Sequence, residues 1–452
     1  MKKSILKKLK IQTKINVMSP KEAPEIIGQA MLNLKALRFC SGQIYAKLDT
    51  HYQCITADEA QDIIYYLIAP DNCIYIPSKK VHEALLRIMR HPYLQIDMQS
   101  AFKKHQMELN LKNGVYDIQT QRLRERKPDD IFDYVLDFDY KSNSDITAAR
   151  HFMKYIETSV REENQDCLLR STGYVLSSLT QGKMALLLLG KPSTGKSVYM
   201  NFLASAVPAE LVTTERFHTM ASERAKASYA GKRLNLAREA NQQPMKHEDG
   251  FKSLISCEDT SGRLLYENTK TIHPHLKFVI GANNDLVFAH PDEAVYNRLV
   301  VIRFTQEIPE DQKDIHLEEN LIAEKDIILS AAIDTLQELI ESNYDFQMAD
   351  DAKDYLAHKK LELNSPVEFL KEKAVLTPSG SVSSTELFKT YTYWCMSNDL
   401  KPVGRNTFRS YVLGYNPTIL SAKVGTPDSQ VRGYKGIALK SYTQEVQTDE
   451  NN

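Results

Sequence analysis

Hydrophobic residues follow two patterns along this chain, and one stretch near the middle combines both. Residues 184–189 form a continuous apolar run, which is typical of a strand buried on both faces. A glycine-containing loop follows, and the apolar positions of residues 196–206 then recur at helical spacing. The pattern predicts a strand, a loop and a helix in direct succession.

The N-terminal third predicts a small α+β domain. Apolar positions from Pro24 to Leu37 follow a helical period, and residues 43–48 and 73–76 are short strand-like stretches. Residues 107–123 predict two strands joined by an Asn-Gly turn.

The segment around the central run predicts an α/β core. Two helices are expected before the run, at residues 145–157 and 166–178. Three more apolar strands and a long amphipathic helix are expected after it, at residues 231–239, 276–284, 297–304 and 314–341.

The last quarter of the chain predicts a second fold unit behind a polar, charged connector that is partly helical around residues 353–361. Ser383 and Glu386 have the spacing of a capping box, which opens one of three expected helices. The expected elements are helices at residues 367–373, 383–396 and 405–413 and strands at residues 418–424 and 434–439. Three helices, a strand, a loop and a strand predict a winged helix.

Composition narrows the class of protein. The chain has 452 residues, so we expect two to four domains, and 42% hydrophobic with 25% charged residues is ordinary for a globular protein. The six cysteines form no C-x-x-C, which argues against a zinc site or a disulfide framework and predicts a reducing cytoplasm. No apolar stretch approaches the ~20 residues that span a membrane.

Charge is balanced over the whole chain but not at its C-terminal end. The net charge is −1, whereas residues 401–440 hold one acid, Asp428, and seven basic residues: Lys401, Arg405, Arg409, Lys423, Arg432, Lys435 and Lys440. The expected third helix carries Arg405, Asn406 and Arg409 where a reader of the DNA major groove would carry them. The alternatives are a solvated basic face or a winged helix that contacts protein.

The loop after the central strand has the G-x-x-x-x-G-K-S pattern of a phosphate-binding loop. Glycines allow the backbone N–H groups to point inward at a phosphate beside the positive end of the next helix. Lys196 is expected to reach the β- and γ-phosphates of ATP, and the Ser197 hydroxyl to bind Mg²⁺. The predicted nucleotide-binding residues are Gly190, Lys191, Pro192, Ser193, Thr194, Gly195, Lys196 and Ser197.

Three further polar residues stand at the ends of the expected core strands. Glu239 ends one strand, where an ATPase keeps the carboxylate that handles Mg²⁺ and the attacking water. Asn283 ends the next and is suited to polarise water or sense the γ-phosphate. Arg298 begins the last and could act as an arginine finger on a neighbouring subunit, which requires a ring. The alternatives are a surface glutamate at position 239 and a local salt bridge at position 298.

The ordered motif set resembles superfamily 3 helicases, and more closely the helicase of virus-, phage- and plasmid-type primase-helicase proteins, also found in mobile genomic islands. The phosphate loop, the Glu239 strand, residues 251–266, the Asn283 strand and Asn297-Arg298-Leu-Val-Val-Ile are similar to its motifs A, B, B-prime, C and arginine finger. Residues 110–117 resemble its N-terminal domain signature. The sequences Tyr393-Trp-Cys395 and Gly433-Tyr-Lys-Gly436 resemble its C-terminal winged helix.

This resemblance implies an α/β fold, with an AAA+-like P-loop helicase core between an N-terminal α+β domain and a C-terminal winged helix. The expected domains are residues 1–145, the core at 146–345, a connector at 346–365 and the winged helix at 366–452. The chain departs from the family at Cys257-Glu258-Asp259, where Gly-Gly-Asp is usual, at Arg238 beside Glu239, and at Asn283, which lacks a nearby proline.

The hypothesis is a homo-hexameric, ATP-driven DNA helicase for replication of a phage, plasmid or genomic island, which the resemblance implies moves 3′ to 5′. A β-hairpin between Arg263 and Leu276 is expected to grip single-stranded DNA, with Lys270 as the first candidate. We expect a separate primase or initiator as partner, because no primase constellation is present. The alternative is an ATP-regulated DNA-binding initiator that does not unwind. A small-molecule kinase explains neither the winged helix nor Arg298.

Overall fold

The structure is a computed structural model of the chain. It describes Leu9 and residues 13–70, 75–240, 243–262, 270–272, 275–307, 314–427 and 429–440, with the backbone alone at 270–272. The chain divides into two compact units. The first comprises Met1–His290 and Arg298–Ala349, and the second comprises Pro291–Asn297 and Asp350–Asn452.

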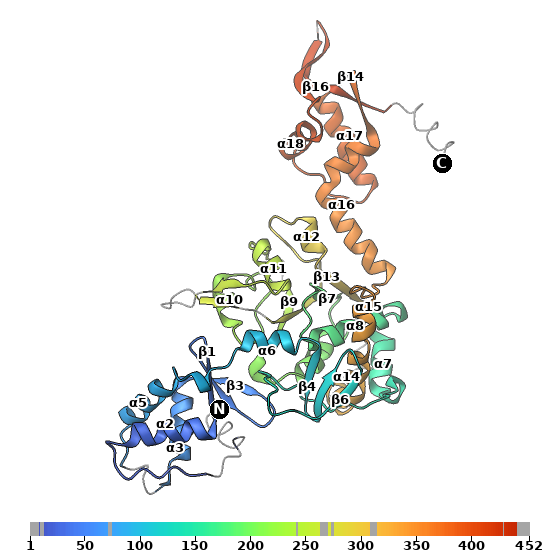
Figure 1. Ribbon diagram of the computed structural model, residues 1–452. Helices are drawn as coiled ribbons and strands as arrows, with labels where there is room; N and C mark the ends of the chain where they lie inside the picture. Colours follow the sequence, from blue (N-terminus) through green and yellow to red (C-terminus); the bar gives the residue numbers. More distant parts are fainter. Residues whose placement is uncertain are drawn as a thin grey trace. The chain divides into compact units, whose positions relative to one another are not determined.

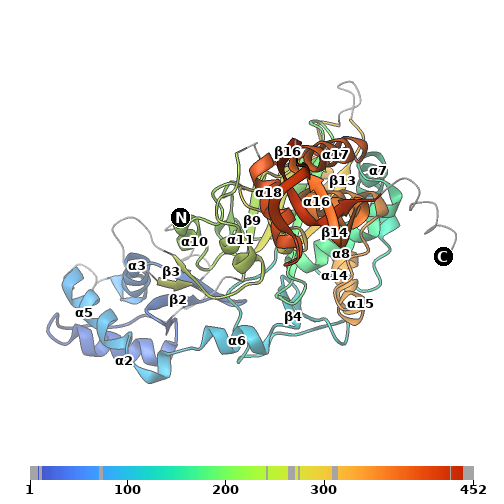
Figure 2. The same cartoon turned by 90° about the horizontal axis from the view of Figure 1, so that it is seen from above.

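The first unit begins with an antiparallel meander and its helices. In both Figures 1 and 2, helices lie beside this small sheet. Its strands are β1 (Leu37–Cys40), β2 (Gln43–Lys47) and β3 (Tyr52–Ile55), and the helices are α2 (Ala23–Leu34), α3 (Ala57–Leu67) and α5 (Ser78–Ile88). They share a core of their own, which includes the buried side chains of Ile27, Phe39, Ile64 and Leu85.

Two predictions in this region are wrong. The sequence predicts a helical period as far as Leu37. In the structure Lys35 adopts a left-handed conformation (φ 52°) that ends α2, and Leu37 begins β1. The strand expected at 73–76 is absent from its described part, because Tyr75 and Ile76 form a turn and a bend. A short apolar run does not distinguish a strand from a buried turn.

After α6 (Met98–Lys104), a second antiparallel sheet packs on the core of the central sheet. Its strands are β4 (Glu108–Leu111), β5 (Gly114–Asp117) and β6 (Arg122–Arg124). The predicted turn is shifted by one residue, because Lys112 and Asn113 form it and Gly114 opens β5. A Cβ on Gly114 would lie 2.6 Å from the carbonyl oxygen of Arg124, so only glycine allows β6 to pair here.

The centre of the first unit is a five-stranded parallel sheet in the order β13-β7-β12-β9-β8. The strands are β7 (Ala185–Gly190), β8 (Val212–Thr213), β9 (Leu234–Ala240), β12 (Lys277–Ala282) and β13 (Leu299–Phe304). The side chains of β7, β12 and β13 are buried almost throughout, as expected for strands covered on both faces, whereas β9 becomes exposed toward its end. All carboxyl ends therefore meet at one edge.

Helices before and after β7 complete the first unit. They are α7 (Arg150–Ser159), α8 (Gln165–Leu176), α9 (Lys196–Ser205), α10 (Glu223–Ser228), α11 (Glu248–Ile255), α13 (Leu317–Ala323), α14 (Lys325–Asp334) and α15 (Leu336–Glu341). The single helix predicted for residues 314–341 is wrong, because it is three helices. Asp334, at the end of α14, accepts hydrogen bonds from the hydroxyls of Tyr116 (2.7 Å) and Tyr140 (2.9 Å), so contacts with distant residues accompany the second break.

The second unit contains a three-stranded antiparallel sheet in the order β14-β16-β15. Its elements are α12 (Glu293–Tyr296), α16 (Asp350–Lys373), β14 (Ala374–Ser383), α17 (Ser384–Ser397), α18 (Arg405–Tyr415), β15 (Leu420–Thr426) and β16 (Ser429–Leu439). Aromatic side chains fill its core, and Tyr391 stacks on Phe408 with ring centroids 4.4 Å apart.

The structure corrects the sequence prediction twice in this unit. A connector and a short helix were expected where α16 runs unbroken through Pro366, whose ring is buried beside the core residues Phe369 and Leu370. Strand β14 was not predicted at all. The order after the first helix is therefore strand, helix, helix, strand, strand. No helix in the described part of the chain is long and apolar enough to cross a membrane.

Candidate functional site

The loop between β7 and α9 is a tight backbone curl. Ser193 (φ 59°) and Gly195 (φ 93°) both have left-handed conformations. Gly190 lies against β13, where an added Cβ would be 2.0 Å from the carbonyl oxygen of Phe304, and a Cβ on Gly195 would be 2.8 Å from the Tyr155 ring. Both glycines of the G-x-x-x-x-G-K-S pattern are therefore needed for the conformation of the loop.

The loop wraps around the ammonium group of Lys196. The Nζ atom donates hydrogen bonds to the carbonyl oxygens of Gly190 and Lys191, both at 2.6 Å, and to Thr194 Oγ1 at 3.2 Å. The residue is 8% exposed, and burial lowers the pKa of the Lys196 ammonium. Its acceptors are neutral, so a positive charge is held beside the N-terminus of α9, an arrangement that favours an anion.

Tyr155 supports the loop from behind and was missed by the sequence analysis. It lies on α7, is 2% exposed and donates its hydroxyl proton to the carbonyl oxygen of Gly195 at 3.0 Å. The helical period of α7 places Tyr155 on a buried face but does not say what it packs against. Only the fold brings α7 to the loop.

Glu239 and Asn283 lie at the same edge of the sheet as the loop. Strand β12 pairs with β7 on one side and β9 on the other, and Ala282 is opposite both Leu189 and Ala240. Asn283 follows Ala282, and Glu239 precedes Ala240 by one residue. Both side chains are exposed, so the structure brings the loop, a carboxylate and an amide to one accessible edge.

Arg238 turns away from this edge and toward α9. It donates a hydrogen bond to Asn201 Oδ1, and Asn201 Nδ2 donates to Glu318 Oε2 of α13 at 2.7 Å. The arginine that occupies the place of an expected small or acidic residue is therefore part of a contact between β9 and two helices.

Arg298 lies at the opposite edge of the sheet. It precedes the amino end of β13, and its carbonyl oxygen accepts from the N–H of Ala185 at 2.8 Å. Gly190 lies five residue steps after Ala185 along β7, or about 16 Å at the rise of a β-strand. Its Nη2 donates to Ser256 Oγ at 3.3 Å. The structure does not bring Arg298 to the phosphate loop of its own chain.

The expected hairpin is described only at its base. Strand β10 (Thr260–Gly262) pairs antiparallel with β11 (Lys270–Ile272), with Gly262 opposite Lys270. Arg263 and the side chain of Lys270 lie outside the described residues, so their predicted DNA contacts stay predictions.

A buried lysine opens strand β12 of the central sheet and was not singled out from the sequence. Lys277 is 4% exposed, and its Nζ donates to the carbonyl oxygen of Leu179 and lies 4.0 Å from the centre of the Tyr174 ring. Burial lowers the pKa of Lys277 to about 8. The charge is satisfied by a carbonyl and a ring face, which is consistent with a structural role.

In the second unit, α18 exposes the three residues predicted to read DNA. Arg405, Asn406 and Arg409 are all exposed, whereas Phe408 between them is buried in the core. The Arg405 guanidinium lies 5.1 Å from the centre of the Phe388 ring. A substitution of Arg409 is therefore better suited than one of Arg405 to test whether α18 contacts DNA.

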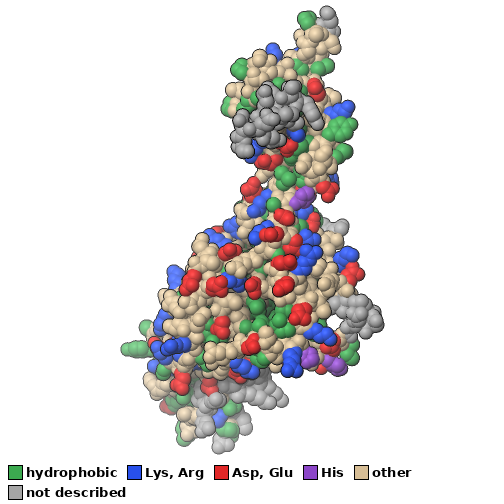
Figure 3. Space-filling model, turned by 90° about the vertical axis from the view of Figure 1, so that its right-hand side faces the viewer, with side chains coloured by type: hydrophobic (Ala, Val, Ile, Leu, Met, Phe, Trp, Pro, Cys, Tyr) green, Lys and Arg blue, Asp and Glu red, His purple; other side chains and the backbone are tan. Residues whose placement is uncertain are grey.

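Acidic and basic side chains are interspersed over the face of the molecule in Figure 3. This mixture agrees with the net charge of −1. A polyanion would therefore be bound by local groups of cations rather than by a field over that whole face.

Two segments of the chain match protein families, and the whole fold is similar to solved structures. Residues 188–298 match a family of unknown function, DUF5906, and residues 66–160 match the family described as D5 N terminal like. The apo structure of the NrS-1 C terminal region (305–718) matches with a TM-score of 0.55 and 10% identity, over 92% of this chain and 99% of that chain.

Two A form apo structures of the same NrS-1 region match similarly. Their TM-scores are 0.52 and 0.53, again at 10% identity, over 92% of this chain and 98% and 100% of theirs. At this identity, the likeness shows a shared fold.

Proposed function

We propose that this protein is a phage-type replication protein of the primase-helicase class, and that it hydrolyses ATP to unwind duplex DNA. Three lines support the replication assignment: the fold shared with the NrS-1 C terminal region, the D5 N terminal like match, and the ordered motifs of the sequence. The proposed ATP hydrolysis rests on one observation. The phosphate loop after β7, Glu239 in β9 and Asn283 after β12 lie at the same edge of the sheet.

The residues at that edge fit ATP and Mg²⁺. The Lys196 ammonium already lies among neutral oxygens inside the loop, and the exposed Ser197 is the second residue of α9. Lys196 would hold the phosphates and Ser197 the metal, while Glu239 would orient or activate water and Asn283 would sense the γ-phosphate. Bound ATP·Mg²⁺ supplies the phosphoanhydride bond whose hydrolysis releases the free energy for movement.

Arg298 supports a ring of subunits. An arginine side chain spans much less than the ~16 Å that separates Arg298 from its own loop. In a homo-hexamer the edge that carries Arg298 would face the loop of a neighbour, where its guanidinium would stabilise developing charge. The ATPase site would then be complete only between subunits.

The second unit would supply duplex affinity as a winged helix. Its strand, helix, helix, strand, strand order after α16 and the exposed basic face of α18 support this role. The β15–β16 hairpin would be the wing.

Strand displacement on a forked DNA duplex, with and without ATP, tests the proposal. Displacement that requires ATP is the expected result. ATP hydrolysis and DNA binding without displacement would select the replication initiator instead.

A further inference from the structure

A basic pocket lies in the first unit, outside the proposed ATPase site. Its volume is about 460 Å³, within the range of small-ligand sites. Three segments line it: the end of α2 at residues 34–36, the turn from β2 to β3 at residues 47–52, and residues 126–128 and 130 after β6.

Cations outnumber acids in the lining. Lys35, Lys47, Arg126 and Lys127 face two acids, Asp49 and Asp130. The three lysines are exposed, so their ammonium groups form an accessible rim. The lining residues Ala36, Leu48 and Tyr52 are at most 7% exposed, whereas Leu34 is half-buried and Pro128 is exposed, so a ligand would meet both charged and apolar surface.

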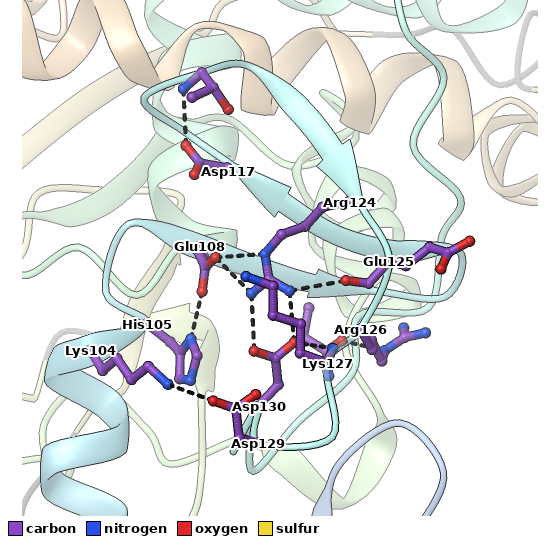
Figure 4. A network of polar contacts seen from close by, with 12 residues as sticks. Lys104, His105, Glu108, Asp117, Arg124, Glu125, Arg126, Lys127, Asp129 and Asp130 are labelled. Carbon is purple, nitrogen blue, oxygen red and sulfur yellow. Dashed lines mark hydrogen bonds and ion pairs between the residues drawn. The ribbon is translucent and has the colours of Figure 1, made fainter.

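Asp130 is already held by a cation from outside the pocket. Figure 4 shows Arg124 between two carboxylates: it donates to Asp130 at 2.7 and 3.1 Å and to Glu108 at 2.7 and 2.9 Å. Although burial opposes the effect, these hydrogen bonds hold the pKa of Asp130 below its usual value. Asp130 therefore stays ionised, and the charge of Arg124 offsets its own. Asp130 also accepts a hydrogen bond from the backbone N–H of Lys127 at 2.8 Å, which helps to fix the segment that carries Arg126 and Lys127.

Arg126 is placed by neutral acceptors. Its Nε donates to Asn110 Oδ1 at 2.8 Å, and its Nη2 donates to the carbonyl oxygens of Leu111 and Lys112. Asn110 is fully buried and also donates to the carbonyl oxygens of Thr50 (2.8 Å) and Tyr134 (2.6 Å), so it ties two pocket walls together. Burial lowers the pKa of Arg126, a cost that a bound anion would relieve.

We propose that this pocket binds the phosphate groups of a single nucleic-acid strand, with Arg126 fixed at one wall and Lys35, Lys47 and Lys127 at the rim. The inference rests on the proposed DNA substrate but not on ATP hydrolysis. Successive phosphates need several cations within reach of one another, which this rim provides.

The test uses binding of a fluorescein-labelled oligodeoxythymidine, followed by fluorescence anisotropy across a salt series. The full chain carries Lys196→Ala and no nucleotide is added, so a failed ATPase assignment leaves the result intact. The double variant Lys47→Glu/Lys127→Glu should bind several-fold more weakly. Its log Kd against log salt slope should be shallower by about 1.4, or about 0.7 for each lost contact.

A matched control separates the pocket from general charge. Lys21→Glu/Lys79→Glu makes the same charge change on exposed lysines that do not line the pocket, and it should keep most of the affinity and slope. Lys47→Gln/Lys127→Gln should give a loss smaller than the Glu pair. Thermal melts by circular dichroism check folding of every variant.

Two results would overturn the proposal. One is equal behaviour of the pocket pair and the control pair, which would make the lysines a solvated surface. The other is release of the labelled strand when ADP is added to the Lys196→Ala protein, which would show that the pocket binds a mononucleotide.

Discussion

At the scale of single residues, the candidate chemistry depends on a few side chains whose surroundings differ sharply. Lys196 is enclosed by the carbonyl oxygens of its own loop, whereas Glu239 and Asn283 are exposed at the sheet edge. Lys277 is buried and contacts a carbonyl oxygen and an aromatic ring. A change at each position should therefore affect a different measurable property.

Lys196→Ala should abolish ATP hydrolysis and unwinding, because it removes the charge that faces the phosphates. The fold should persist, since the lost hydrogen bonds lie within one loop. Turnover assays and a circular dichroism melt measure the two effects. Wild-type turnover would show that the site lies elsewhere.

Glu239→Gln should retain ATP binding and lose hydrolysis, because the amide keeps the shape of the side chain but not its charge. Its exposure predicts little change in the free energy of unfolding. Fluorescent-nucleotide titration beside a phosphate-release assay distinguishes the two steps. Loss of binding as well would make Glu239 a structural residue.

The lowered pKa of Lys277 predicts that the stability of the protein depends on pH in the alkaline range. Its pKa of about 8 lies below the model-peptide value of 10.5, so between these values the unfolded chain binds a proton that the folded chain has released. The free energy of unfolding should therefore rise with pH between about 8 and 10.5. Below pH 8 the folded protein bears the full cost of burying the Lys277 charge. Urea unfolding at pH 7 and 9.5 should show wild type gaining roughly 2 kcal/mol over Lys277→Met. Parallel pH profiles of the two proteins would contradict this.

At the scale of elements, the two helices that carry candidate functional groups are positioned in different ways. Helix α9 follows the buried strand β7 after one short loop, so its N-terminus must lie at the edge of the sheet. Helix α18 is held by one buried aromatic face, with Phe408 stacked on Tyr391, and its charged face remains exposed. The local sequence determines the first position, and packing determines the second.

Arg409→Ala should weaken duplex DNA binding and make its salt dependence shallower by about 0.9, the value for one phosphate contact on a duplex. Lys389→Ala, on the exposed face of α17, is the matched control and should change neither quantity. Gel shifts across a salt series measure both. Identical salt dependence for the two variants would contradict DNA binding by α18 and favour a helix that contacts protein.

At the scale of the whole molecule, the arrangement of the parallel sheet separates groups that the proposed chemistry needs together. The loop, Glu239 and Asn283 share the carboxyl edge, and Arg298 precedes the amino end of β13. Within one chain the constellation is incomplete. Assembly is therefore the condition on which the proposed mechanism depends.

Arg298→Ala should reduce turnover by on the order of 10³, as for other arginine fingers. A mixture of Arg298→Ala and Lys196→Ala chains should regain ATPase activity, because some interfaces then join an intact loop to an intact arginine. Co-purification of differently tagged chains verifies mixing. Mixed rings without activity would exclude action across the subunit boundary.

The sequence by itself determined the local parts of this protein. The buried run before the phosphate loop and the helix after it could be predicted. So could the strand that carries Glu239 and the strand before Asn283, because apolar period and turn chemistry act over a few neighbouring residues. Adjacent parallel strands then place their carboxyl ends together without further information.

Only the tertiary structure decided which distant groups meet. Tyr155 behind the loop, Asn110 between Thr50 and Arg126, and Arg298 at the far edge all depend on long-range pairings that leave no local pattern. The same holds for the breaks between α13, α14 and α15 and for the missed strand β14. Burial and hydrogen bonding across the fold outweigh local propensity there, because each contact joins segments far apart in the chain.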